Sequence, residues 1–215
     1  MKNISLIFLS AVLIILLGCS PTQLIKQWKH QDYKSFKPKN VLVIGVTVNK
    51  QSRKTYEETL TSELHKRKIK ALQSAVVFGA SFKDSKQTEE EIEAQVEKLK
   101  LNGYDAILVS LVKGVKERKS LSNNTKADYK LRKFIDFYKA SQITYFDDSN
   151  YKEYKVFEIE TSLYSLNNKQ EKALIWVGTY EMVNPENSEK TINKYIKTVL
   201  KSLEKENIIP KNKET

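Results

Sequence analysis

The chain has 215 residues, of which 40% are hydrophobic, and its 37 lysines and arginines outnumber 26 aspartates and glutamates to give a net charge of +11. A chain of this length can bury a substantial core, and its composition excludes the disordered and fibrous classes. One cysteine excludes an intramolecular disulfide and a cysteine-built zinc or iron–sulfur centre, and two histidines leave few other ligands, so we expect no metal centre.

Residues 1–18 have the pattern of an export signal. Lys2 precedes an uncharged apolar run at residues 4–17, which is shorter than the roughly 20 residues of a membrane-spanning helix. The Leu-Leu-Gly-Cys sequence at residues 16–19 resembles the lipobox of bacterial lipoproteins. The resemblance implies cleavage before Cys19 and acylation of its thiol. A plain secretory peptide and an uncleaved anchor are the alternatives.

The acylated cysteine also predicts a location. Two or three acyl chains, at about 0.8 kcal/mol per buried CH₂, hold a protein on a membrane without a spanning helix. By resemblance to the sorting rule of such lipoproteins, Ser20 in place of aspartate after Cys19 points to the outer membrane of a Gram-negative envelope. We therefore expect a domain that faces the periplasm and contacts the membrane through Cys19.

Residues 19–40 are polar and basic, with isolated apolar residues such as Trp28. We interpret this segment as the lipidated cysteine followed by a tether. It either lies near anionic headgroups, with Trp28 at the interface, or is an ordinary solvated linker. His30 lies within it and is expected to be solvated.

Residues 41–112 alternate between strand and helix patterns. Apolar, β-branched runs predict strands at 41–48, 71–78 and 105–112, the second of them weaker. Tyr56, Leu60 and Leu64, at four-residue spacing, predict a helix at 53–68. A capping box from Thr88 to Glu91 begins a second helix, which Asn102-Gly103 ends. This βαβαβ order requires right-handed crossovers.

The last third of the chain changes character. Alternating residues at 156–166 and 173–183 predict an antiparallel hairpin with a turn at 167–170, and Ser188 begins a helix that Pro210 stops. The predicted fold class is α/β (α+β): a βαβαβ unit, a hairpin and a C-terminal helix in a mixed sheet with helices packed on it. We assign residues 41–206 to one domain and 207–215 to a C-terminal tail.

Residues 113–155 form an unusual insertion in this pattern. They hold eleven lysines and arginines against six acids, together with eight tyrosines and phenylalanines. We expect the flanking strands to extend here as a basic, aromatic β-ribbon. The candidate partner-binding residues are Lys130, Arg132, Lys133, Phe134, Phe137 and Tyr138.

Signatures of catalysis are missing from the sequence. It has no nucleophile elbow, no His-Glu-x-x-His, no Walker loop and no dinucleotide fingerprint. His65 is interpreted as a surface helix residue, and Glu158 and Glu160 as part of a solvated strand face. We therefore expect no enzymatic activity.

Two hypotheses for function remain. In the first, the ribbon binds an envelope protein or an anionic envelope surface through rings and positive charge. In the second, the ribbon pairs between copies to form a homo-oligomer. A third reading is that the rings simply pack on the parent sheet. No nucleic-acid partner is expected, because an exported chain seldom meets one.

The order of elements over residues 41–204 resembles that of small, mostly uncharacterised envelope lipoproteins. More distantly it is similar to the amino-terminal domain of TolB, the lipoprotein activators of penicillin-binding proteins, and the curli secretion lipoprotein. The markers are Arg53, Glu57 or Glu58, the Gly-Tyr-Asp-Ala sequence at 103–106 and the Leu-Ile-Trp sequence at 174–176. The resemblance implies an accessory or adaptor role through protein contacts, with no cofactor.

Overall fold

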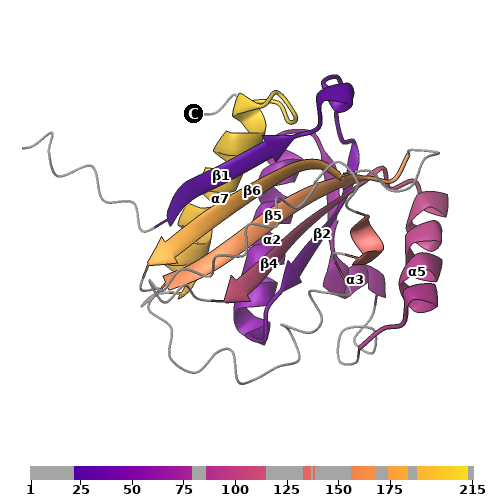
Figure 1. Cartoon of the computed structure of the whole chain (residues 1–215), viewed down its shortest axis with the longest axis horizontal. Helices are drawn as coiled ribbons and strands as arrows, with labels where there is room; N and C mark the ends of the chain where they lie inside the picture. The colour runs from indigo at the N-terminus through magenta and orange to yellow at the C-terminus, as the bar shows by residue number, and fades with distance from the viewer. Residues whose placement is uncertain are drawn as a thin grey trace, which may run out of the picture.

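The computed structural model of the protein describes residues 22–78, 86–114, 133–136, 138, 156–167, 174–183 and 188–212. Six strands within these residues form one sheet in the order β1-β6-β5-β4-β2-β3 (Figure 1). Strand β2 is parallel to β3 and β4, whereas the other neighbours are antiparallel. The predicted α/β (α+β) class with a mixed sheet is confirmed.

The bounds of the elements follow the chain. The strands are β1 (Thr22–Lys29), β2 (Asn40–Val46), β3 (Lys70–Gln73), β4 (Ala106–Gly114), β5 (Val156–Ser165) and β6 (Leu174–Val183). The helices are η1 (Gln31–Tyr33), α2 (Lys50–Lys66), α3 (Ser74–Phe78), α5 (Glu89–Leu101) and α7 (Ser188–Lys205).

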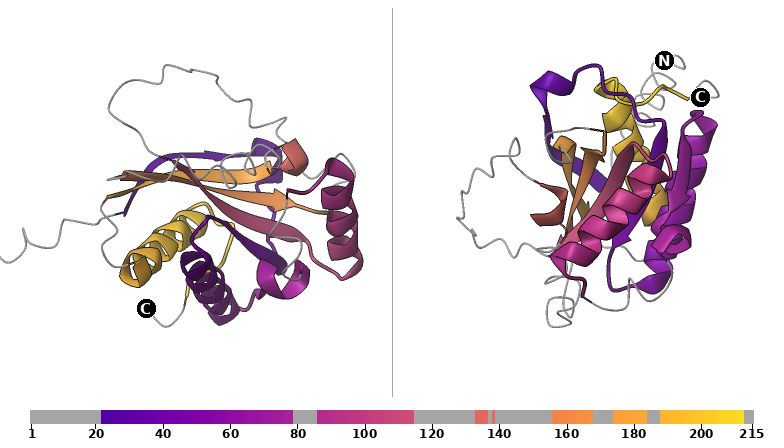
Figure 2. Two further views of the ribbon diagram at one scale, coloured as in Figure 1. Left: turned by 90° about the horizontal axis from the view of Figure 1, so that it is seen from below. Right: turned by 90° about the vertical axis from the view of Figure 1, so that its right-hand side faces the viewer.

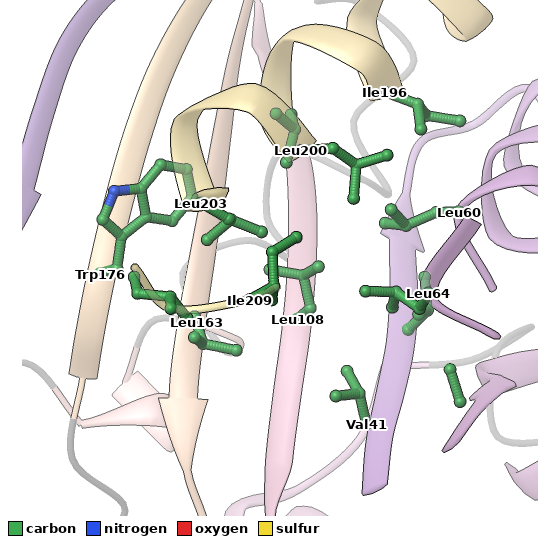
Figure 3. Close-up of a cluster of buried hydrophobic side chains, with 14 of the residues drawn as sticks. Val41, Leu60, Leu64, Leu108, Leu163, Trp176, Ile196, Leu200, Leu203 and Ile209 are labelled. Atoms are coloured by element: carbon green, nitrogen blue, oxygen red, sulfur yellow. The ribbon is translucent and has the colours of Figure 1, made fainter. Parts of the chain in front are cut away.

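Helices α2 and α7 lie side by side on one face of the sheet (Figure 2). Figure 3 shows their buried side chains meeting over the strands, with contributions from Leu60, Leu64, Ile196, Leu200 and Leu203. The other face is covered by α5, whose Ile92, Val96 and Leu99 pack on the alternate residues of β2 and β4. The two faces explain why most residues of β2 and β4 are apolar, since each side of these strands is buried.

The local signals at the helix ends are confirmed. Thr88 accepts a hydrogen bond from the Glu91 amide at 3.2 Å, and the Glu91 carboxylate accepts one from the Thr88 amide at 2.8 Å. Gly103 has a φ of +80°, which favours glycine, and it ends α5 as predicted. Helix α2 buries Tyr56, Leu60 and Leu64, the three residues of the predicted stripe.

The interpretation of residues 22–40 as a tether is wrong. Residues 22–29 form the edge strand β1, which pairs antiparallel with β6. His30 is buried, not solvated: its backbone amide donates to Ile175 at 2.9 Å, and its ring lies edge-on to Trp28 and Tyr33. The sheet therefore begins well before residue 41.

The predicted strand at 71–78 is also only partly right. Strand β3 covers residues 70–73, and α3 begins at Ser74. The Glu57 carboxylate of α2 accepts hydrogen bonds from the Ser74 hydroxyl at 2.6 Å and the Ala75 amide at 3.3 Å. An acceptor at the first turn favours helix, because the first amides of a helix have no partner within it. This long-range contact ends the strand early.

Strands β5 and β6 confirm the predicted hairpin, but its second face is not solvated. Glu160 and Tyr164 are at most 1% exposed, and Glu160 forms an ion pair with Lys113 at 2.8 Å. The expectation that Glu160 belongs to a solvated face is therefore wrong, because its carboxylate is buried and paired with Lys113 of the neighbouring strand β4. Of the predicted turn, only Asn167 lies among the described residues.

The predicted boundary at residue 206 separates residues that pack together. Ile208 and Ile209 are buried in the core cluster between α2 and α7, where Ile209 is visible in Figure 3. The end of the domain is therefore later than we expected.

Candidate functional site

Some of the candidate ribbon residues are described by the structure and others are not. Lys130, Arg132 and Phe137 lie outside the described residues, as does Cys19, and Lys133 is exposed. Residues 134–136 and Tyr138 are helical rather than extended. Phe134 is only 3% exposed, and its ring lies 5.4 Å from that of Tyr164 and 5.5 Å from that of Tyr138.

Phe134 is therefore not an exposed partner-binding ring. It packs on the face of the sheet opposite α2 and α7, where Figure 2 shows the short helical turn that carries it. For this residue the reading in which rings pack on the parent sheet is the correct one. The structure does not describe enough of residues 113–155 to place the other basic and aromatic candidates together.

A pocket of about 380 Å³, hereafter the strand-end pocket, lies where β2 and β4 end. These strands are parallel neighbours, but α2 leaves β2 over one face of the sheet and α5 approaches β4 over the other. Open α/β sheets bind ligands at such a switch in direction, outside the carboxyl ends of the strands. The topology alone therefore makes this place a candidate site.

The walls of the strand-end pocket are mostly apolar. They come from the ends of β2 and β4, the first residues of β5, the end of β6, and the first turns of α2 and α7. The lining residues are Gly45, Val46, Thr47, Val48, Asn49, Ser52, Arg53, Tyr56, Ser110, Val112, Phe157, Ile159, Met182, Ile192 and Tyr195. Arg53, which is half-buried, is the charged side chain in this described set.

Hydroxyl groups from four elements form a network at one side of the pocket. The Ser110 hydroxyl of β4 lies 2.5 Å from the Tyr56 hydroxyl of α2 and 2.9 Å from that of Tyr195 in α7. Thr161 of β5 joins the network, at 2.8 Å from Ser110 and in contact with the Tyr195 hydroxyl. These hydroxyls satisfy one another within the protein.

The tyrosine hydroxyls in this network hold their protons. Burial raises the pKa of Tyr56 well above its ordinary value of 10.0, and the neighbouring Tyr195 raises it further, against a smaller opposing effect of the hydrogen bond to Ser110. Burial likewise raises the pKa of Tyr195. Both groups stay protonated and uncharged at neutral pH, so they orient hydrogen bonds without acting as bases.

A buried carboxylate holds the wall of the pocket in place. Glu57 is 1% exposed, and it accepts hydrogen bonds from the Gly45 amide at 3.0 Å and from the Ser74 hydroxyl. A Cβ at Gly45 would lie 3.0 Å from the Tyr56 ring, so glycine allows α2 to approach the end of β2 closely. Glu57 thus fixes the strand end that lines the pocket, although it does not line the pocket itself.

The pocket was not predicted from the sequence. Nearly half of its lining residues are valines, isoleucines and tyrosines, whose patterns describe only strands and helices. One signal was present in Ser110, a hydroxyl residue within the apolar run from Ala106 to Val112. Arg53 and Glu57 were noted as markers of the fold, and they lie at the pocket and behind it.

The described residues lack both a metal-binding cluster and a membrane-spanning helix. They contain no group of three or more His, Cys, Asp or Glu side chains that could hold a metal ion. No helix in the part of the chain that the structure describes is long and apolar enough to cross a membrane.

Comparisons with known proteins give distant likenesses. No protein-family model matches the sequence, and no curated protein matches it. The PelC dodecamer from Paraburkholderia phytofirmans is 10% identical, with a TM-score of 0.43 over 83% of this chain and 94% of that chain. Lipoprotein GNA1162 from Neisseria meningitidis is 11% identical, with a TM-score of 0.40 over 78% of this chain and 99% of that chain.

Likenesses at this level decide neither the fold nor the function of this chain. The resemblance to TolB, to activators of penicillin-binding proteins and to the curli secretion lipoprotein stays a prediction.

Proposed function

We propose that the protein is a lipid-anchored accessory protein of the bacterial cell envelope that acts by binding rather than by catalysis. Its anchor is the acylated Cys19, and its location is the periplasmic side of the outer membrane. The lipobox-like sequence at residues 16–19 supports the anchor, and Ser20 supports the location. The strand-end pocket is its binding site.

The chemistry of the strand-end pocket is the observation that carries the proposal. Its lining residues include no Asp, Glu, His, Cys or Lys, so this described set offers no general base or nucleophile of ordinary reactivity. The tyrosine hydroxyls stay protonated, and their hydrogen bonds are made within the protein. An apolar pocket with a few fixed polar groups is the usual form of a binding site.

Anchoring is tested by replacing the acylated residue. Cys19→Ser should abolish incorporation of labelled palmitate in a Gram-negative host, since this single change removes the thiol that is acylated. Ser20→Asp is the matched control, because it keeps acylation and alters only the sorting signal. Palmitate incorporation that persists in the Cys19→Ser protein would contradict the anchor.

Binding is tested with a photocrosslinking residue in the pocket. Benzoylphenylalanine in place of Ile192, at the pocket wall, should give a discrete adduct in cells that express the acylated full-length protein. The same residue in place of Leu101 is the control, because Leu101 is 88% exposed on α5, a helix that does not line the pocket. Equal adducts from both positions, or none from position 192, would refute the pocket as the binding site.

The basic residues of the insertion stay a second proposed contact with an envelope protein or anionic surface. Changing Lys130, Arg132 and Lys133 to Glu should leave the Ile192 adduct intact if the pocket acts alone. Loss of the adduct would show that these basic residues are needed to bind the partner. Adducts between copies of the chain would instead support the proposed homo-oligomer.

A further inference from the structure

The strand-end pocket lies at the end of the domain where the chain begins its first strand. Thr22, the first residue of β1, pairs with Met182 of β6, and Met182 lines the pocket. Figure 1 shows that β1 starts on the side of the sheet where the arrowheads of β2, β4 and β6 lie. The pocket and the start of β1 therefore share one end of the sheet.

The distance to the anchor is limited by chain length. Cys19 precedes Thr22 by three residues, and three residues of any conformation span at most about 11 Å. An acylated Cys19 would therefore hold this end of the sheet close to the membrane surface. The opposite end of the sheet, where η1 and the start of β2 lie, would face away from the membrane.

The lining of the pocket selects the kind of occupant. Val112, Phe157, Ile159 and Ile192 present apolar surface, and the hydroxyl network nearby is already satisfied by its own members. An apolar chain can enter without leaving these polar groups unpaired, so its burial in the pocket is favourable. A polar occupant would find few groups to bind.

The positive charge of Arg53 further restricts which ligands fit the pocket. Arg53 is the charged residue of the lining, and its guanidinium matches the geometry of a phosphate or carboxylate. A ligand that has an apolar tail and one anionic group therefore complements the pocket. Membrane phospholipids with anionic headgroups have both parts, and the chain length from Cys19 places them within reach.

We propose, on the basis of the proposed function, that the strand-end pocket faces the anchoring membrane and takes an acyl chain of an anionic phospholipid, whose phosphate lies near Arg53. The occupant is a lipid of the membrane itself, not the acyl group attached to Cys19.

The test uses the acylated full-length protein in vesicles that contain phosphatidylglycerol with a photoactivatable acyl chain. Illumination should label peptides that contain Phe157, Met182 or Ile192. Phosphatidylcholine carrying the same chain should label them several-fold less, because it lacks net negative charge. Labelling spread over all exposed peptides, or absent from these three, would overturn the proposal.

Two variants with matched controls sharpen the test. Ile192→Trp narrows the pocket from a half-buried position and should reduce labelling, whereas Leu101→Trp adds the same ring on α5 and should not. Arg53→Gln should remove most of the several-fold preference for the anionic lipid, because it removes the charge-assisted hydrogen bond to that lipid. Lys54→Gln, an exposed change on the same helix, should leave it unchanged. Equal effects of a variant and its control would overturn the assignment.

A further arm separates the two sources of acyl chain. Cells fed photoactivatable palmitate carry the label on Cys19, and an internal crosslink from this label to the pocket would overturn the membrane lipid as occupant. The outcomes that refute the lipid as occupant differ from those that refute the pocket as a binding site. A protein adduct at position 192 without lipid labelling refutes the lipid alone, whereas no adduct of either kind refutes both.

Discussion

Gly178 of β6 lies between two fully buried aromatic residues, Trp176 and Tyr180, on the same face of the strand. A Cβ at this position would lie 2.6 Å from Cη2 of Trp176 and 2.7 Å from the hydroxyl oxygen of Tyr180. Both distances are shorter than any van der Waals contact. We predict that Gly178→Ala destabilises the protein because these rings have no free space into which to move.

The size of the effect follows from the packing. Overfilling a well-packed core costs about 1–3 kcal/mol. For a chain of this length each kcal/mol lowers Tm by about 2–4 °C, so the variant should melt roughly 2–12 °C below the wild type. The indole of Trp176 also packs beside Leu203 of α7, as Figure 3 shows, which resists its displacement.

Urea denaturation followed by tryptophan fluorescence measures the free energy of unfolding. The control is a double-mutant cycle with Trp176→Phe, since this change removes the two indole carbons nearest to the added methyl. In that background Gly178→Ala should cost clearly less than in the wild type. Equal costs in the two backgrounds would refute the steric explanation.

Three further predictions concern pH and helix capping. Burial tends to raise the pKa of Glu63, but hydrogen bonds from Lys66 and Arg67 hold it below its ordinary value of 4.5. The stability from this group is present above that value and is lost as the pH falls through the lowered pKa of the folded state, so Glu63→Gln should lose less stability on acidification. Equal urea midpoints across the acid range would contradict this. Burial raises the pKa of Tyr195, so the contribution of Tyr195 to the stability of the fold is present below pH 10.0 and is lost as the pH rises. Tyr195→Phe should therefore flatten the fall in stability at alkaline pH, measured by circular dichroism. Thr88→Ala removes one half of the capping box and should cost about 1 kcal/mol in urea denaturation, and an unchanged midpoint would show that the cap adds nothing.

The parts of the fold that could be predicted are those specified by neighbouring residues. Strands β2 and β4 are apolar on both sides, and the start of α5 depends on Thr88 and Glu91, which are three positions apart. In these cases the physical cause lies within a few residues of the chain. The sequence pattern therefore contains the whole signal.

Strand β1 was missed for two physical reasons. Its partner, β6, is distant in the chain, and a register shift between Leu24 and Lys26 leaves Ile25 as an extra residue. An extra residue reverses the alternation of buried and exposed positions, so the period-two pattern of a strand is hidden. Ile25 is 44% exposed, in keeping with its place in this bulge.

The candidate site could be predicted least of all. The strand-end pocket exists because the ends of six elements meet, and no local pattern records which ends these are. Glu160 shows the same limit, since its ion-pair partner Lys113 lies on another strand, 47 positions away in the chain. Ser110 was the local irregularity that could have pointed to the site.

The pairing of β1 with β6 also constrains how the domain is assembled. Gln27 and Lys29 of β1 donate hydrogen bonds to Glu206, and the first of these contacts joins residues 179 positions apart. A chain made from its amino terminus cannot pair β1 in the sheet until β6 has been made. Contacts of such long range slow folding, and the unpaired edge of β6 is exposed until they form. Strand β1 therefore completes the sheet only after its partner β6 has formed, although β1 comes first in the described chain.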